Sequence, residues 1–392
     1  MNNREAVIVG TGEVPCGKYP DRSPLDIAIS VAEQAIADSG LERKDIDTVL
    51  VGPCFADPWF HTDLGFARMV DELSLRETVK LNAQINAGGS TGTALLKTAV
   101  SMVESGRAEA VLCLHAEKFT NLSGQQGFDF FAKAGIERDF EAPFGMVYNA
   151  MPAFVAQRYL HETGRPVEDL AEVTVSCRDW AALHPNAMFR KRITVDEVMA
   201  SKVVASPMHS LMLNMLGDGG SAFIVTTAER AKGVQPQPVY LWGEGGIVNT
   251  YSFAQHVDVT RMNWAQVANQ AYKQARVSAS DIDIVEIYMA YPIFHLVLME
   301  EMGFCKRGEA GELYKSGATK PGGSLPVSTF GDAMSYGHIG AGIGLACIVE
   351  SVRQLQGKCG ERQVKDASVV LKAACGGAYA DAQITIFGKE PR

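Results

Sequence analysis

Three tyrosines and one histidine stand in two short phrases whose residue types suit proton transfer. Tyr288 and Tyr291 share one phrase, and Tyr336 precedes the pair Gly337 and His338 in a glycine-rich loop. A tyrosine held by a hydrogen-bonding neighbour can act as acid or base, and a histidine among glycines can support a carbonyl oxygen. Each tyrosine could equally pack in the core with its hydroxyl satisfied, and the histidine could be an ordinary loop residue.

A cysteine and two glycine-rich segments could complete a carbonyl-binding site. Cys375 is followed by Gly376 and Gly377, and Gly89 and Ser90 stand just before a helix expected over residues 92–105. A thiol can give up a proton, although a core cysteine beside a glycine turn is an equally good interpretation. A serine nucleophile would need a base beside it.

Composition excludes several classes of protein. The 392 residues include 47% hydrophobic and 21% charged ones, enough for a large core, and the formal net charge is −9. We expect no nucleic-acid partner, because phosphate neutralisation needs a basic patch. No segment is long and apolar enough to span a membrane, and the start is too polar for a signal peptide. The eight cysteines are scattered without paired metal-ligand spacing, so we expect no metal site and a cytoplasmic protein.

The elements that must position these residues occur twice. A helix over residues 23–39 precedes the strand pattern of 44–52, and a helix over 264–277 precedes the similar pattern of 280–288. The repeated order predicts an internal duplication, in which each half alternates strands and helices around a buried sheet.

Further buried strands are expected at residues 5–10, 110–115, 222–227, 368–372 and 382–387. Residues 120–207 show poorer periodicity and many aromatics, including Phe128, Phe130 and Phe131, which suits an inserted lid that holds a helix over 152–164. The predicted parts are residues 1–119 with 208–235, the lid at 120–207, and residues 236–392.

Several phrases together resemble the thiolase superfamily, and within it the sterol-carrier-protein-type branch. They are residues 158–164, 169–173, 184–187, 217–222, 285–288 and 337–340. The resemblance covers nearly the whole chain and implies the thiolase fold, an α/β architecture of two duplicated halves in five layers, αβαβα.

The resemblance implies a nucleophilic cysteine at the start of a buried helix, where the helix N-terminus favours the thiolate. Gly89 stands where that cysteine would align, and no cysteine lies between Cys54 and Cys113. An ordinary thiolase reaction is therefore not expected. The family's Gly-His loop matches Gly337 and His338, and its second cysteine matches Cys375.

Thiolase-fold aldolases of bacterial steroid side-chain degradation also lack the cysteine and act through tyrosines, and the chain resembles them. Retro-aldol cleavage of a β-hydroxyacyl-coenzyme A needs no nucleophile, since it requires only proton removal and enolate stabilisation. The resemblance implies Tyr288 and Tyr336 as the acid–base pair, Tyr291 as substitute, His338 at the thioester oxygen and Cys375 as proton donor. The substrate-binding residues expected are Gly89, Ser90, His295, Gly340, Gly376 and Gly377.

The same resemblance implies a coenzyme A thioester as substrate, no covalently bound cofactor, and a small partner protein with a zinc ribbon and an OB-fold. It also implies a homodimer, for which we expect strand 110–115 to be the exposed sheet edge. Two alternatives stay open: an acyltransferase subunit of a larger complex, and a catalytically silent acyl-CoA-binding subunit.

Overall fold

The computed structural model describes residues 4–52, 65–127, 135–234 and 236–392, so the aromatic trio Phe128, Phe130 and Phe131 lies outside the described residues. Its main sheet has the strand order β3-β2-β4-β7-β1-β8-β11-β10-β9. The strands are β1 (Ala6–Gly17), β2 (Thr48–Val51), β3 (Leu81–Gln84), β4 (Ala110–Glu117), β7 (Asp218–Thr227), β8 (Val239–Val248), β9 (Ile284–Tyr288), β10 (Val369–Ala374) and β11 (Asp381–Gly388).

The sheet consists of two halves with matching topology. β2 and β4 are parallel, as are β9 and β10, and each pair continues into two antiparallel neighbours, β7 and β1 or β11 and β8. Only two residue pairs, Val7 with Tyr240 and Ile8 with Val239, join the halves through β1 and β8. The expected duplication is therefore present in the strand order.

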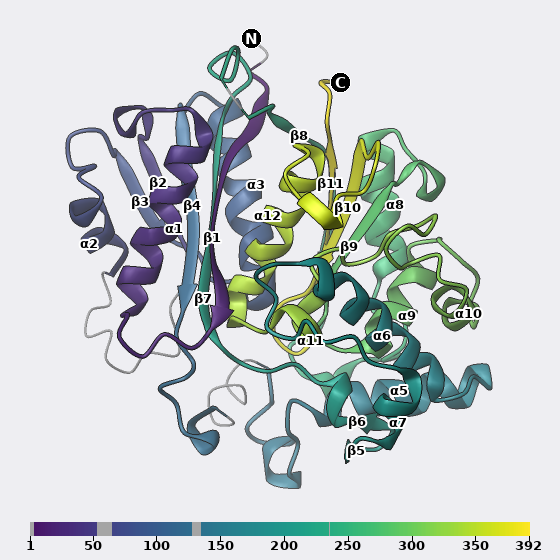
Figure 1. The fold of residues 1–392 in the computed structure, drawn as a ribbon. Coiled ribbons are helices and arrows are strands. Elements are labelled where there is room, and N and C mark those ends of the chain that lie inside the picture. The colour runs from purple at the N-terminus through teal and green to yellow at the C-terminus, as the bar shows by residue number, and fades with distance from the viewer. Residues whose placement is uncertain (1–3, 53–64, 128–134, 235) are drawn as a thin grey trace.

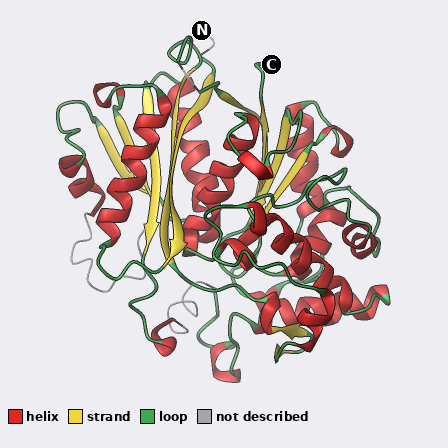
Figure 2. Ribbon diagram, in the orientation of Figure 1, coloured by secondary structure: helices red, strands yellow, loops and turns green. Residues whose placement is uncertain are grey.

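Helices cover and separate the two half-sheets, giving the five-layer thiolase fold (Figure 1; Figure 2). Helix α1 (Pro24–Ser39) packs on the outer face of the first half-sheet and α8 (Trp264–Ala275) on that of the second. Helices α3 (Thr91–Glu104) and α12 (Ile343–Leu355) lie between them. A Cβ added at Gly92 would lie 2.8 Å from the carbonyl carbon of Gly344, so these glycines permit the central helices to cross in close contact.

The remaining elements pack mainly around the second half. Helix α6 contacts α7, α9, α10 and α11, and a two-stranded ribbon of β5 and β6 lies nearby. Their bounds are α2 (Gly65–Glu72), α5 (Ala150–Thr163), α6 (Glu168–Leu183), α7 (Val195–Ala200), α9 (Pro292–Glu301), α10 (Ala310–Lys315), α11 (Asp332–Tyr336), β5 (Val203–Ala205) and β6 (Met208–His209). The boundaries of the three predicted parts stay a prediction.

Local sequence explains why the predicted elements form. Ser23 caps α1 in a reciprocal capping box with Asp26, and Gly40 ends the helix in a left-handed conformation with φ 71°. Every residue of β7 and β10 is buried, because helices cover both faces, so both strands lack a strict alternation of apolar and polar residues.

No helix of the described residues is long and apolar enough to cross a bilayer.

The predicted sheet edge is wrong. Strand β4, which contains residues 110–115, is paired on both sides, with β2 and β7, and all its residues are buried. The outer strands of the described sheet are β3 and β9. A mostly apolar strand has the same composition at an edge and in the centre of a sheet, so the sequence pattern could not place this one.

Candidate active site

One cavity of about 510 Å³ collects most of the predicted site residues. Its wall is formed by the start of α3, the β9–α9 junction, the loop after α11, the β10–β11 loop and parts of the region between β4 and β7. The residues that line it are Gly88, Gly89, Phe119, Thr120, Leu122, Ser123, Gly124, Gly127, Tyr148, Asn149, Asn214, Met215, Leu216, Tyr288, Met289, Ala290, Tyr291, His338, Gly340, Ala341, Cys375, Gly377 and Tyr379.

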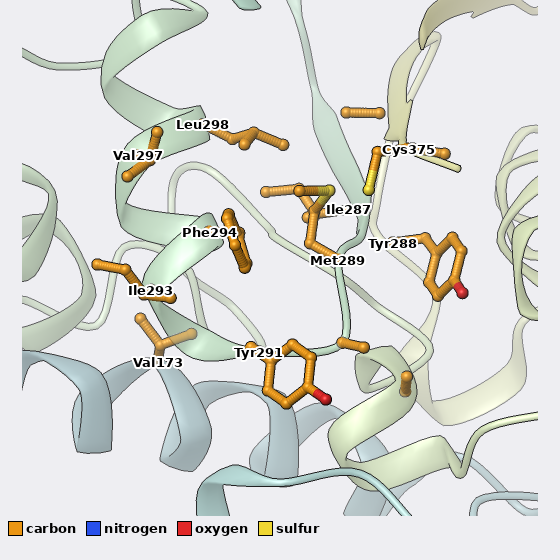
Figure 3. Packing of buried hydrophobic residues seen from close by; sticks show 14 of the residues in the cluster. Val173, Ile287, Tyr288, Met289, Tyr291, Ile293, Phe294, Val297, Leu298 and Cys375 are labelled. Atoms are coloured by element: carbon orange, nitrogen blue, oxygen red, sulfur yellow. The ribbon is translucent and has the colours of Figure 1, made fainter. Parts of the chain in front are cut away.

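Tyr288 occupies the space in front of the residue that aligns with the thiolase nucleophile. Figure 3 shows its ring turned away from Ile287 and Met289 at the end of β9. A Cβ added at Gly89 would lie 2.6 Å from Tyr288 Cε1, 3.1 Å from its hydroxyl oxygen and 2.3 Å from the carbonyl oxygen of Cys375. Glycine at position 89 and tyrosine at position 288 are therefore sterically linked, and a cysteine side chain has no room there.

The hydrogen bonds of His338 determine whether the Tyr288 hydroxyl accepts or donates a proton in its contact with the imidazole. The Gly340 amide donates to His338 Nδ1 at 3.1 Å, and His338 Nε2 lies 3.1 Å from the Tyr288 hydroxyl. Since Nδ1 accepts, a neutral imidazole carries its proton on Nε2 and donates it to the Tyr288 oxygen. Tyr288 then keeps its own proton for a third group.

Burial keeps these groups uncharged at neutral pH. It lowers the pKa of His338 to about 4 and raises the pKa of Tyr288 well above its usual value, to which nearby Tyr148 and Cys375 add. It also raises the pKa of the Cys375 thiol well above its usual value, with a further contribution from Asp381. The site therefore presents a neutral imidazole, a neutral phenol and a neutral thiol, and no thiolate nucleophile.

Asp381 joins the two glycine segments under the cavity. Its Oδ1 accepts hydrogen bonds from Ser90 Oγ at 2.9 Å and from the Gly376 amide at 2.5 Å. Ser90 belongs to the single turn Gly88–Ser90 that leads into α3, where the first backbone amides have no acceptor within the helix. Ser90 and Gly376 hence set the position of the cavity-lining Gly89 and Gly377 and do not line the cavity themselves.

Two further phenols border the cavity from different elements. The Tyr291 hydroxyl donates to Asn149 Oδ1 at 2.6 Å, and the Tyr148 hydroxyl donates to the carbonyl oxygen of Gly377. Ala290, between Tyr288 and Tyr291, has φ 61°, a conformation that a residue with a side chain rarely adopts. This strained residue allows the chain to turn from β9 into α9 with both tyrosines at the cavity.

Tyr148, Asn149, Asn214 and Tyr379 are cavity residues that the sequence did not identify. Tyr148 and Asn149 lie in the region of poor periodicity, where no motif marks one aromatic above another. Tyr379 follows the Cys-Gly-Gly phrase by two residues, so its closeness to that phrase is the one sequence feature that could have marked it as a cavity residue.

Tyr336 does not line the cavity that Tyr288 lines, so the structure does not join the predicted acid–base pair at one site. The Tyr336 hydroxyl donates to Glu13 Oε1, and the opposite carboxylate oxygen accepts from Arg353 at 2.6 Å. Burial alone would raise the pKa of Glu13, but the nearby Arg353 and His184 have the larger effect and lower it to about 2. Tyr336 is absent from the cavity wall because α11 turns its side chain towards β1.

His295 is likewise outside the cavity, contrary to its predicted role in substrate binding. It is fully buried on α9, with Nδ1 3.0 Å from the Tyr314 hydroxyl and Nε2 3.2 Å from Asp332 Oδ2. His295 lies in the first turn of α9, on the side of that helix that contacts Tyr314 of α10 and Asp332 of α11. Among the described residues, no group of three or more His, Cys, Asp or Glu side chains is arranged to hold a metal ion.

Comparison with known proteins agrees with this geometry. Residues 245–389 match the family described as thiolase C-terminal domain-like. A steroid side-chain-cleaving aldolase of Thermomonospora curvata is 30% identical, with 95% of each chain covered. This chain belongs to the thiolase superfamily. An acetyl-CoA acetyltransferase of Methanothermobacter thermautotrophicus is 29% identical, with 98% of this chain and 100% of the relative covered. The solved Ltp2-ChsH2(DUF35) aldolase has a TM-score of 0.84 at 27% identity, with 98% of each chain covered.

Proposed function

We propose that this chain is an acyl-CoA aldolase that cleaves the Cα–Cβ bond of a β-hydroxyacyl-coenzyme A without a covalent acyl-enzyme. The observation that carries the proposal is the contact between Gly89 and Tyr288. The space that a nucleophile would need holds a neutral phenol, which can exchange protons and cannot be acylated as a thiolate would be. The similarity to a steroid side-chain-cleaving aldolase supports the same reaction class.

The reaction needs one proton to move from the β-hydroxyl group to Cα. As the hydroxyl proton leaves, the β-carbon becomes a ketone or aldehyde carbonyl, and the electron pair of the Cα–Cβ bond forms the thioester enolate. Protonation at Cα then yields the shortened acyl-coenzyme A. No second coenzyme A enters, in contrast to thiolysis. The β-hydroxyl group also does not have to be oxidised to a ketone beforehand, so no electron acceptor is required.

Tyr288 is suited to relay that proton while it stays uncharged. Its oxygen accepts from His338 and can accept the substrate hydroxyl proton as its own proton passes to the thioester oxygen, which gives an enol. The neutral Cys375 thiol then protonates Cα, and the enol proton returns to sulfur. This order avoids a buried phenolate, whose formation the raised pKa of Tyr288 disfavours.

The backbone amides of Gly89 and Gly377 are the proposed donors to the thioester oxygen, whose partial negative charge grows until the proton of Tyr288 reaches it. Gly89 lies in the first turn before α3, where the helix N-terminus favours an anion, and Gly377 lies in the facing loop. Preorganised amide donors of this kind can each contribute a hundredfold or more to a rate. His338 contributes by orienting Tyr288, and Gly340 by fixing the tautomer of His338.

An apolar acyl group fits the rest of the wall, to which Phe119, Leu122, Leu216 and Met289 contribute. We propose a steroid side-chain thioester, on the similarity to the aldolase of Thermomonospora curvata. A small zinc-ribbon and OB-fold partner is proposed because the similar Ltp2 aldolase is named together with ChsH2(DUF35). A homodimer is a further proposal, and the exposed edge strand β3 offers it a surface.

The test is product analysis with purified chain, alone and with the proposed partner, on a branched β-hydroxyacyl-coenzyme A. Mass spectrometry should detect a carbonyl compound and a shortened acyl-coenzyme A in equal amounts, and Tyr288→Phe should slow the formation of both about 100- to 10,000-fold. Binding of the thioester without cleavage, with the partner present, would instead indicate an acyl-CoA-binding subunit.

A further inference from the structure

Tyr379 carries two features that folding alone does not explain. It has φ 62°, although a bulky aromatic residue rarely occupies the left-handed region, and its hydroxyl is buried without a hydrogen-bond partner among the described residues. Its side chain is only 2% exposed, and its ring lies 4.1 Å from that of Phe294. A buried, unsatisfied hydroxyl and a strained backbone at one residue together indicate a functional position.

The surroundings of Tyr379 place that hydroxyl in the candidate active site. The residue lines the cavity, and it follows the Cys375–Gly377 loop that borders the proposed thioester position. Burial raises the pKa of Tyr379, and nearby Tyr148 and Tyr291 add to the shift, so the group is a neutral donor. The protons of Tyr148 and Tyr291 are donated to Gly377 and Asn149, whereas that of Tyr379 is not committed within the described residues.

We propose that Tyr379 binds the oxygen on the β-carbon of the acyl-coenzyme A and so selects substrates that carry it. The inference rests on the proposed function. Tyr288 and the glycine amides take the thioester oxygen, and the next oxygen of a β-hydroxyacyl or β-ketoacyl thioester is two carbons along the chain. Tyr379 lines the same cavity as Tyr288 and lies near enough for Tyr288 to contribute to its raised pKa. A hydrogen bond there would satisfy the Tyr379 hydroxyl and hold the oxygen from which the cleavage reaction removes a proton.

The experiment compares the binding of octanoyl-coenzyme A and 3-oxo-octanoyl-coenzyme A by calorimetry. The 3-oxo compound has the β-oxygen but no hydroxyl proton, so retro-aldol cleavage cannot remove it during the measurement. We expect the full chain to bind it about 3- to 10-fold more tightly than octanoyl-coenzyme A, and Tyr379→Phe to reduce that preference to about 1. Because the readout is binding, the result does not depend on whether the chain is an active aldolase.

A thermal unfolding measurement distinguishes a ligand contact from a structural one. Tyr379→Phe should leave the midpoint unchanged or raise it, because it removes an unsatisfied buried hydroxyl. The matched control is Tyr272→Phe, whose hydroxyl donates to the Met302 carbonyl oxygen at 2.9 Å outside the cavity; it should lower the midpoint and keep the preference. Equal affinity for both ligands in the unmodified chain, or an unchanged preference in Tyr379→Phe, would overturn the proposal.

Discussion

Replacing Gly89 by alanine tests the steric link between this residue and Tyr288. The new Cβ would lie 2.3 Å from the Cys375 carbonyl oxygen and 2.6 Å from Tyr288 Cε1, whereas side-chain Cβ contacts essentially never fall below 3.0 Å. Against that limit the Cys375 carbonyl oxygen, which is backbone of the β10–β11 loop, must retreat by about 0.7 Å and the Tyr288 ring by about 0.4 Å. Overpacking of this size typically costs about 1–3 kcal/mol.

We expect Gly89→Ala to lower the free energy of unfolding by about that amount and to reduce kcat/KM by at least about 100-fold, since both catalytic loops must move. Chemical unfolding and the aldolase assay measure the two effects. Gly17→Ala is the matched control, because its Cβ would come no closer than 3.3 Å to any atom, and its nearest neighbours belong to the Tyr19 side chain. Near-normal stability and activity of Gly89→Ala would refute the steric argument. Gly89→Cys should likewise form no acyl-enzyme in intact-mass measurements.

Further predictions concern the polar groups of the site. Tyr288→Phe should lower kcat/KM about 100- to 10,000-fold, whereas Tyr336→Phe should mainly weaken stability, because it only loses a bond to Glu13. The pKa of His338 is lowered to about 4, so its imidazole stays neutral above that pH. Ionisation of His338 should therefore cause no change in kcat/KM near pH 6.5, and His338→Gln should not alter the shape of the pH profile there. Buried neutral His338 should also make the free energy of unfolding fall as pH drops from 6.5 towards 4, where the unfolded chain alone binds a proton, and His338→Gln should reduce that slope. Asp381→Ala should lower kcat more than 10-fold, with Asp381→Asn retaining most activity because an acceptor oxygen for Ser90 and Gly376 remains.

The sequence predicted the fold well, because periodicity and caps are local. Helix α1, with Ser23 and Gly40 at its ends, and the duplicated strand order follow from such signals. The position of strand β4 does not, since a buried strand has the same composition at any place in a sheet. Which strand forms an edge depends on pairing between segments far apart in sequence.

The candidate site could be predicted only in part for a related reason. The residues around Tyr288 and His338 in the sequence identify both as site candidates, and the structure brings the two side chains together. Tyr336 comes just before the same glycine-rich loop, but its hydroxyl points to Glu13 instead, and sequence position does not reveal side-chain direction. Tyr148 reaches the cavity from a region without regular periodicity. No spacing rule connects residues 148, 288 and 379, which only the tertiary structure brings together.

The most direct test of nucleophile-free cleavage follows the fate of coenzyme A. The chain would receive a β-hydroxyacyl-coenzyme A and, in a parallel reaction, the matching β-ketoacyl-coenzyme A, each together with free coenzyme A that carries a heavy-isotope label. Every coenzyme A thioester formed would be weighed by mass spectrometry. A retro-aldol reaction leaves the original coenzyme A on the fragment with Cα and releases the fragment with Cβ as a free carbonyl compound. We therefore predict that the β-hydroxyacyl compound is cleaved without any labelled thioester, and at an unchanged rate when the free coenzyme A is omitted. A labelled thioester of the Cβ fragment from the β-ketoacyl compound, with no cleavage of the β-hydroxyacyl compound, would contradict the aldolase mechanism and indicate thiolysis.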